Sequence, residues 1–375
     1  MAKKKGGIKV PDIKSLQKKY GAAAIPVPDT STEQLWIPFD SLAINYLLGG
    51  GLPYGRVIET AGYESTGKSL LILNAAKNVI KLGGRVLWGD HENTWSNAWA
   101  EKNGLDPSKV TVYNDNDIEG LSDWVRDMSL YWRSQLTNNE PILVVADSIA
   151  ALETTDNIEA DQKNGKAQMG NRAKAIDQMY RKRVRFFAKY GITFCPINQV
   201  REKLGAGLFE DSTTTPGGKA TAFYSTIRLM LVRSKAIKHK IRGKEKKVGQ
   251  NIYVRVVKNK ISPPKDSLKT EVYFRDEYTG YVGYSKYAGL ADAFEDEGIV
   301  TKKGSRYYLD DSMIANGEEA FTKKLATDSE LRKKLIKLSS INTLSKTRAL
   351  LDELEVNLFP VDGADDSEEE DDDEG

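Results

Sequence analysis

The stretch Gly62-Tyr63-Glu64-Ser65-Thr66-Gly67-Lys68-Ser69 determines the fold class expected for this 375-residue chain. It matches the pattern G-x-x-x-x-G-K-[ST], whose glycines let backbone N–H groups curl around phosphates. The pattern requires a strand before it and a helix after it. The sequence supplies both, because Val57-Ile58 is apolar and β-branched and residues 68–82 have helical apolar spacing. We therefore expect a phosphate-binding loop in an α/β domain.

The loop assigns roles to individual residues. Lys68 is expected to neutralise the β- and γ-phosphate oxygens, the Ser69 hydroxyl to reach Mg²⁺, and the helix N-terminus to add its dipole. The predicted cofactors are ATP or dATP with Mg²⁺. The predicted nucleotide contacts within the loop are Gly62, Glu64, Ser65, Thr66, Gly67, Lys68 and Ser69.

Two further strands end on carboxylates. Residues 142–146 are apolar and lead to Asp147, which we expect beside the loop, holding Mg²⁺ through water. Val86-Leu87-Trp88 leads to Gly89-Asp90-His91-Glu92 at the same edge of the sheet. Glu92 is the candidate base that activates water, and a helix cap or a solvated loop carboxylate is the alternative interpretation.

Apolar strands alternate with helical segments from about residue 35 to residue 275, which predicts a largely parallel sheet flanked by helices. The second long helix is expected over about 172–189. After Val272 the pattern changes to short helices and a small hairpin. The predicted organisation is an N-terminal helix segment (1–34), the α/β core (35–277), a small C-terminal α+β domain (278–358) and a disordered acidic tail (359–375).

Composition limits the classes of function. No apolar run is long enough for a membrane span, and the single Cys195 permits no internal disulfide, so we expect a cytoplasmic protein without a membrane partner. The net charge is +2, but residues 362–374 hold ten carboxylates and no bases, which leaves about +12 on the rest. A body this basic suits a polyanion such as nucleic acid.

Several stretches together resemble the RecA family of DNA recombinases. Residues 197–201, 213–220 and 223–229 resemble the second DNA-binding loop and its flanks, and Val256-Val257-Lys258-Asn259-Lys260-Ile261 resembles a further family segment. Gly50–Arg56 and Asp147–Leu152 also match, and the likeness is collinear from about Ile13 to Leu309. The resemblance implies a RecA-type P-loop ATPase core that forms helical filaments on single-stranded DNA and pairs that strand with homologous duplex.

The resemblance also implies roles at the nucleotide. It places the catalytic glutamate at Glu92 and a γ-phosphate-sensing amide at Gln199. Lys258 and Lys260 fall where family members reach the neighbouring subunit's nucleotide, and Phe223 resembles a residue at the subunit boundary. Trp99 falls at the position of an aromatic that stacks on adenine, although a core role for Trp99, or stacking by Trp95 instead, stays open.

Two loops are expected to contact DNA, one at about 157–172 and one over 202–219. Both are polar and contain glycine, so they could order around a phosphate backbone. Arg181 follows the first loop and Arg201 and Arg228 flank the second, and for each predicted arginine a solvated or salt-bridged surface role is the alternative. The predicted DNA-binding residues are Met169, Gly170, Arg172, Arg181, Arg201, Thr214, Gly217, Gly218 and Arg228.

Other functions of the same fold remain open on sequence alone. A hexameric DNA helicase or motor is the main alternative, and a non-enzymatic DNA scaffold would be expected to have lost Lys68, Glu92 or Asp147. The lysine-rich segment 233–247 and the altered second loop are typical of a divergent or phage-borne relative. Single-strand-binding and loader proteins are further expected partners, in the cytoplasm of a bacterial or phage-infected cell.

Overall fold

The computed structural model describes residues 34–137, 139–162, 170–202, 213–214, 219–241, 243–263, 265–274 and 282–343. The chain divides into two compact units, residues 1–34 and 35–375. Residues 1–33 of the predicted N-terminal helix segment, the boundary predicted between 277 and 278, and the acidic tail all lie outside the described residues. The described helices and strands belong to the second unit.

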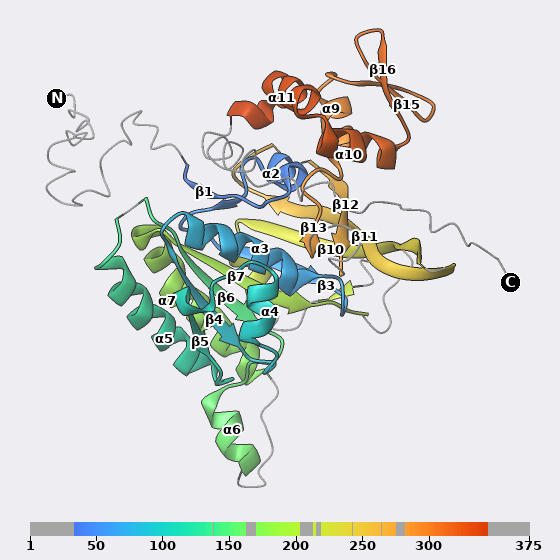
Figure 1. The fold of residues 1–375 in the computed structure, drawn as a ribbon. Coiled ribbons are helices and arrows are strands. Elements are labelled where there is room, and N and C mark those ends of the chain that lie inside the picture. The colour runs from blue at the N-terminus through green and yellow to red at the C-terminus, as the bar shows by residue number, and fades with distance from the viewer. Residues whose placement is uncertain are drawn as a thin grey trace, which may run out of the picture. The chain divides into compact units, whose positions relative to one another are not determined.

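A nine-stranded sheet organises this unit, in the order β13-β12-β11-β10-β3-β7-β6-β4-β5 (Figure 1). The strands from β10 to β5 run parallel, and β10 to β13 pair antiparallel. This confirms the expected largely parallel sheet. The strands are β3 (Ile58–Gly62), β4 (Arg85–Asp90), β5 (Val110–Tyr113), β6 (Ile142–Asp147), β7 (Ile192–Gln199), β10 (Ile227–Ile241), β11 (Lys244–Asn259), β12 (Ser267–Tyr273) and β13 (Gly283–Tyr284).

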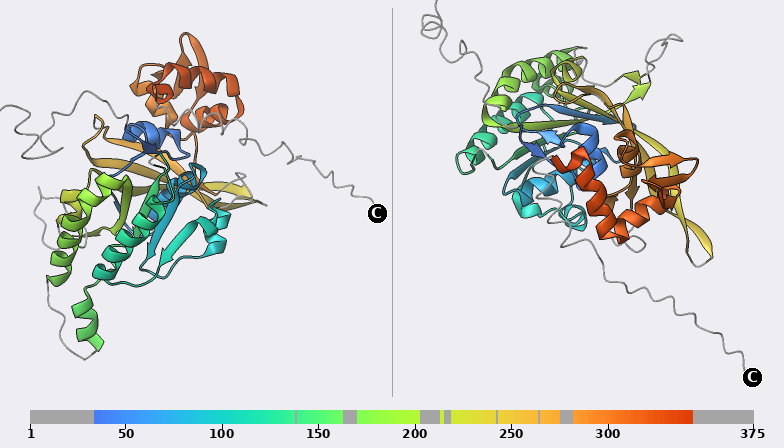
Figure 2. Two further views of the ribbon diagram at one scale, coloured as in Figure 1. Left: turned by 90° about the vertical axis from the view of Figure 1, so that its left-hand side faces the viewer. Right: turned by 90° about the horizontal axis from the view of Figure 1, so that it is seen from above.

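Helices cover both faces of the sheet, which explains the continuous apolar runs of the central strands. In β6, Leu143 and Val145 belong to the same buried cluster as helix α3 (Lys68–Lys81). Ile142 and Val144 belong to the cluster on the opposite face, beneath α5 (Ile118–Arg133) and α7 (Asn171–Tyr190) (Figure 2). Neighbouring side chains of one strand therefore enter two different cores.

Shorter elements connect these layers, and one of them is a helix where the sequence predicted a loop. Part of the segment expected to be an irregular loop over about 157–172 is helix α6 (Thr155–Gln162), and Arg172 already lies in α7. Capping rather than apolar spacing supports α6, because the Asn157 backbone N–H donates to Thr154 Oγ1 at 3.2 Å. The remaining short elements of this region are β1 (Trp36–Ile37), α2 (Leu42–Leu48), β2 (Leu52–Pro53), α4 (Asn97–Lys102), η2 (Pro107–Lys109), β8 (Arg201–Glu202), β9 (Thr213–Thr214) and α8 (Ala220–Tyr224).

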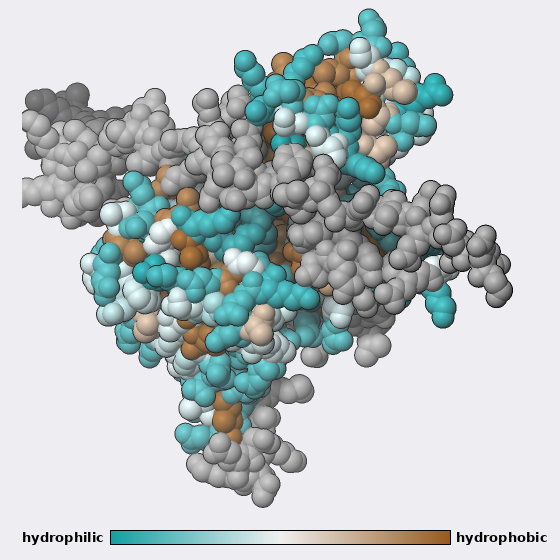
Figure 3. Space-filling view, in the orientation of Figure 1, coloured by the Kyte–Doolittle hydropathy of each residue, from teal (hydrophilic) through white to brown (hydrophobic). Residues whose placement is uncertain are grey.

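The C-terminal segment contains the predicted short helices, but its hairpin is a three-stranded antiparallel sheet. Phe294, Tyr307 and Phe321 are fully buried there and pack on one another. In the space-filling view the surface is largely hydrophilic, with hydrophobic residues showing in this segment (Figure 3). Its elements are α9 (Leu290–Asp296), β14 (Thr301–Lys303), β15 (Arg306–Leu309), β16 (Ser312–Asn316), α10 (Glu318–Thr327), α11 (Ser329–Leu338) and η4 (Ser340–Thr343).

Candidate functional site

The phosphate loop joins β3 to α3 through backbone conformations that favour glycine. Gly67 is the N-cap of α3 with φ +83°, and Ser65 also has a positive φ of +55°. A Cβ at Gly62 would lie 2.7 Å from the Leu231 carbonyl oxygen, so no side chain fits there. Lys68 begins the helix, and its Nζ donates to the Tyr63 carbonyl at 2.8 Å across the loop. The predicted loop is therefore a closed turn at a helix N-terminus.

Strand register brings the other predicted residues to the same edge. Gly62 lies opposite Gln199 in the β3–β7 pair, and Asp90 lies opposite Asp147 in the β4–β6 pair. Parallel strands end at a common edge, so four strands deliver their last residues side by side. The His91 backbone N–H donates to the Asp147 carbonyl at 2.8 Å, which ties the turn before Glu92 to this edge.

These residues line a pocket of about 440 Å³, a size suited to a small-molecule cofactor. Most of the predicted nucleotide residues border it. The pocket is also lined by three residues that were not predicted from the sequence, Leu70, Ser148 and Ile197. The predicted residues in its wall are Glu64, Ser65, Thr66, Gly67, Lys68, Ser69, Glu92, Trp99, Asp147 and Gln199.

Charge is concentrated at the base of this pocket. Burial raises the pKa of Asp147 to about 6, and nearby Glu92 and Asp90 add to the shift while Ser69 and Lys68 oppose it. Burial lowers the pKa of Lys68, although Asp147, Glu92 and Glu64 favour its charged form. Clustered carboxylates next to a serine hydroxyl and a helix N-terminus are the donors that Mg²⁺ and a polyphosphate require. The residues present therefore fit a magnesium nucleotide.

Glu92 is held by two side chains at this edge. Ser148 Oγ donates to Glu92 Oε1, and Gln199 Nε2 donates to the same oxygen at 3.1 Å. The Glu92 carboxylate is thus neither a helix cap nor merely solvated, which were the alternatives considered for it. Ser148 directly follows Asp147, the last residue of β6. Its place next to the predicted Mg²⁺ ligand is the one sequence signal that could have identified Ser148 as a site residue.

Two tryptophans were candidates for stacking on a base, and the structure separates them. Trp99, in α4, lines the pocket. Trp95 packs on the buried Trp88, with ring centroids 5.3 Å apart, and meets Trp99 edge-on at 6.5 Å. Trp95 therefore supports Trp99 from the core side.

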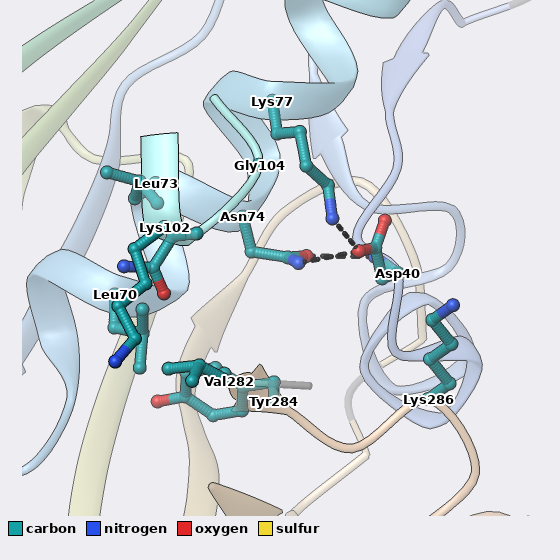
Figure 4. Close-up of a pocket in the computed structure, with 12 residues that line it drawn as sticks. Asp40, Leu70, Leu73, Asn74, Lys77, Lys102, Gly104, Val282, Tyr284 and Lys286 are labelled. Carbon is teal, nitrogen blue, oxygen red and sulfur yellow. Dashed lines mark hydrogen bonds and ion pairs between the residues drawn. The ribbon is translucent and has the colours of Figure 1, made fainter. Parts of the chain in front are cut away.

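A second pocket of about 290 Å³ adjoins the loop helix and is lined by Asp40, Lys77 and Lys286 among others (Figure 4). Burial alone would raise the pKa of Asp40, but the ion pair with Lys77, helped by a hydrogen bond from Asn78 and the charge of Lys286, outweighs burial and lowers it. Burial lowers the pKa of Lys286 to about 8. Tyr284, also in this wall, donates from its hydroxyl to the Gly67 carbonyl at 3.1 Å and so braces the phosphate loop. No local sequence signal points to that contact.

The predicted DNA-binding residues are more scattered. Gly170 is the N-cap of α7, and the Arg172 guanidinium donates to the Ile149 and Ala150 carbonyls at 3.0 and 2.6 Å. Arg181 is exposed and pairs with Asp177 at 2.8 Å. Arg201 and Thr214 face each other across the β8–β9 pair. Met169, Gly217 and Gly218 lie outside the described residues.

Arg228 pairs with a buried carboxylate within the sheet. Its Nε donates to Glu59, whose side chain is fully buried, and Asn198 Nδ2 donates to the other Glu59 oxygen at 3.0 Å. The Arg228 side chain is itself 22% exposed. Within the described structure its guanidinium is thus a partner of Glu59.

We expect Arg228→Ala to lower the free energy of unfolding by about 3 kcal/mol, because it leaves the Glu59 charge buried without its cation. Urea unfolding would measure this, with Arg233→Ala, at an exposed position on the same strand, staying within about 0.5 kcal/mol of the wild type. Adding Glu59→Gln to Arg228→Ala should recover part of the loss. An Arg228→Ala variant as stable as the wild type would contradict the proposed importance of this pair.

Lys258, Lys260 and Phe223 form a separate group. Lys258 is the register partner of Arg228 in the β10–β11 pair, and Arg228 is the register partner of Glu59 in the β10–β3 pair. Glu59 lies near the start of β3, whereas the phosphate loop follows its end. Lys258 is therefore at the opposite end of β3 from the phosphate loop. Lys258 Nζ donates to the Ala222 and Phe223 carbonyls at 2.8 and 3.0 Å, and the Phe223 side chain is 71% exposed. Neither lysine lines this chain's own pocket.

Comparison with known proteins agrees with this geometry. Residues 9–278 match the RecA N-terminal domain family. The protein named RecA from Aquifex aeolicus is 32% identical over 336 residues, 88% of this chain and 91% of that protein. RecA from Lactobacillus delbrueckii subsp. bulgaricus is 33% identical over 84% of this chain and 89% of its own. RecA from Tropheryma whipplei is 35% identical over 81% of this chain and 66% of its own. The chain belongs to the RecA family.

Proposed function

We propose that this protein binds ATP and Mg²⁺ in the pocket of the phosphate loop and hydrolyses ATP in response to DNA, as a filament assembled on single-stranded DNA. Its family acts in ATP-dependent homologous recombination by DNA strand exchange. The observation that carries the proposal is the convergence of Lys68, Asp147, Glu92 and Gln199 on one pocket at the end of four parallel strands.

The residues of the pocket suggest a division of labour. Lys68 and the N-terminus of α3 would bind the phosphates, while Ser69 and Asp147 would hold Mg²⁺, which supplies charge neutralisation when bound. Trp99 would stack on the base. Tyr284, through the Gly67 carbonyl, would position the loop without touching the nucleotide.

Glu92 would accept a proton from the attacking water. A carboxylate can do this only when it is ionised and aimed at the water, and two donors already fix its direction. Ser148 and Gln199 both bond Oε1, which leaves the second carboxylate oxygen for the water. Ser148 is therefore a positioning residue in this scheme.

Gln199 would link nucleotide to DNA. In the structure its amide donates to Glu92, and a γ-phosphate entering the pocket would offer that N–H a more highly charged acceptor. Gln199 is the last residue of β7, and the second predicted DNA loop follows it along the chain. A change of partner at Gln199 could thus reposition the start of that loop.

We expect Gln199→Ala to leave ATP affinity within a few-fold, since one hydrogen bond is worth about 1 kcal/mol, while removing the effect of nucleotide on DNA affinity. The measurement is single-stranded DNA affinity with triphosphate and with diphosphate, in wild type and variant. Gln135→Ala, at an exposed position near the end of α5, is the matched control. A wild-type ratio of affinities in Gln199→Ala would show that the signal travels by another route.

Lys258 and Lys260 would act on the nucleotide of an adjoining subunit. The register places Lys258 away from this chain's own phosphate loop. Lys258 Nζ donates to the backbone carbonyl of Phe223, whose side chain is exposed. A large exposed aromatic side chain such as Phe223 is suited to a subunit contact. Hydrolysis would then require assembly, as with an arginine finger supplied in trans.

A hexameric helicase or motor of the same fold is the main alternative, and the family assignment does not favour it. The deciding experiment is electron microscopy of the protein with single-stranded DNA and a non-hydrolysable ATP analogue. The proposal predicts helical filaments that disappear with ADP. Closed rings would favour the motor, and isolated protomers on DNA would favour a scaffold.

A further inference from the structure

A turn directly after β6 carries Ser148, the residue that holds the candidate base. The turn covers residues 148–151, and the Ala151 N–H donates to the Ser148 carbonyl at 3.0 Å. The Ile149 N–H donates to the Ile197 carbonyl of β7 at 2.9 Å, and the Ile149 side chain is fully buried. The N–H side of this turn is therefore tied to the central sheet.

The carbonyl side of the turn is held by one arginine from helix α7. Arg172 Nη2 donates to the Ile149 carbonyl at 3.0 Å and to the Ala150 carbonyl at 2.6 Å. A guanidinium keeps its charge and holds its N–H donors in a fixed plane, so it can bond two neighbouring carbonyls at once. Arg172 is the second residue of α7, whose N-cap is Gly170. The turn is thus fastened to the start of α7 as well as to the sheet.

These contacts form a continuous path from the start of α7 to the candidate base. Arg172 holds the carbonyls of the turn, Ser148 begins the turn, and Ser148 Oγ donates to Glu92 Oε1. Gly170, which was predicted to meet DNA, lies two residues before Arg172. A misplacement of about 1 Å at a reacting group can cost roughly a hundredfold in rate. A small change at the start of α7 can therefore alter the chemistry at Glu92.

We propose that Arg172 is a positioning residue for ATP hydrolysis, and the link through which DNA at the start of α7 acts on Glu92. This role differs from the contact with DNA that the sequence predicted for Arg172. DNA bound beside Gly170 would restrict the start of α7 and hold the guanidinium against both carbonyls. Ser148 would then be fixed, and Glu92 would be aimed at the attacking water. The inference rests on the proposed function, because it concerns the same hydrolysis of ATP.

The test is steady-state ATP turnover by Arg172→Ala with saturating single-stranded DNA. The kcat should fall by about 10- to 100-fold, because Glu92 is no longer aimed. The KM for ATP should stay within a few-fold, since the phosphate loop is unchanged, and such a split indicates an interaction made in the transition state. Turnover without DNA should also stay within a few-fold of the wild type.

The matched control is Arg185→Ala, at an exposed position on α7, which should keep wild-type turnover. Circular dichroism checks that the Arg172 variant is folded. A folded Arg172→Ala protein with the wild-type kcat would overturn the proposal. An equal loss of turnover with and without DNA would overturn the link to DNA.

Two measurements separate positioning from a direct contact with DNA. Losing one phosphate contact would reduce the slope of log single-stranded DNA affinity against log salt by about 0.7, whereas the proposal predicts an unchanged slope in Arg172→Ala. Arg172→Lys keeps the positive charge but has a shorter side chain without the planar donors, so its kcat should remain low. A reduced slope in Arg172→Ala, or a wild-type kcat in Arg172→Lys, would show that Arg172 acts as a phosphate contact instead.

Action through Glu92 is tested by combining substitutions. Adding Arg172→Ala to Glu92→Gln should not lower the residual turnover further, because the side chain that Arg172 helps to aim has already lost its function. The losses from Arg172→Ala and Ser148→Ala should likewise not add. Additive losses would place the effect of Arg172 elsewhere and overturn the proposal. A wild type without DNA-dependent hydrolysis would overturn the proposed function too, whereas a normal wild type with additive variants would overturn this inference alone.

Discussion

Replacing Lys68 with Ala should abolish both ATP hydrolysis and strand exchange. Lys68 is the cation of the phosphate loop, and the surrounding Asp147, Glu92 and Glu64 would otherwise repel a polyphosphate. Removing one preorganised charge from such a site costs roughly a hundredfold to a thousandfold in rate, about 3–4 kcal/mol. The measurements are steady-state ATP turnover with single-stranded DNA and the yield of exchanged strands.

The matched control is Lys109→Ala, an exposed lysine in η2 that should leave both activities within a few-fold. Circular dichroism checks that the Lys68 variant is folded, since its Nζ also bridges the loop through the Tyr63 carbonyl. A folded Lys68→Ala protein that exchanges strands at the wild-type rate would show that the nucleotide site lies elsewhere.

Glu92→Gln should separate nucleotide binding from chemistry. The amide keeps the shape of the side chain but cannot accept the proton of water, so turnover should fall by about 10²–10⁴-fold. Filaments should still form and should persist longer, because the triphosphate state is no longer consumed. Turnover is measured by phosphate release, and persistence by filament disassembly after dilution.

Glu101→Gln, an exposed carboxylate on α4, is the control for the loss of one negative charge near the site. It should turn over ATP at close to the wild-type rate. Fast hydrolysis by Glu92→Gln would mean that another group activates the water, and Ser148 and Gln199 would then hold a carboxylate with no part in the chemistry.

Much of the core could be predicted because local patterns agree with it. Helix α3 ends within one residue of the predicted helix, and the β4 and β6 strands contain the predicted apolar runs. Parallel pairing then forces their C-terminal residues together, which is why Asp147 and Glu92 could be assigned to one edge from strand endings alone. Helix α5 was missed, although Ile118, Leu121 and Val125 have helical spacing.

Contacts between residues distant in sequence could not be predicted. Nothing near Arg228 indicates that it meets Glu59, 169 residues earlier, or that Tyr284 reaches the Gly67 carbonyl. The full length of β10 and β11 was also hidden, because lysines replace the apolar alternation that marks a half-buried strand. Within the described ranges, every helix is too short or too polar to span a lipid bilayer.

Strand exchange itself is the most direct test of a recombinase that uses this pocket. Single-stranded circular DNA is mixed with labelled linear duplex and the purified full-length chain, with ATP and Mg²⁺, and exchanged products are followed over time. Such a recombinase should give products with homologous duplex and ATP, and almost none with ADP, with unrelated duplex or with the Lys68→Ala variant. Products of equal yield without ATP, or strand separation that ignores homology, would contradict this function.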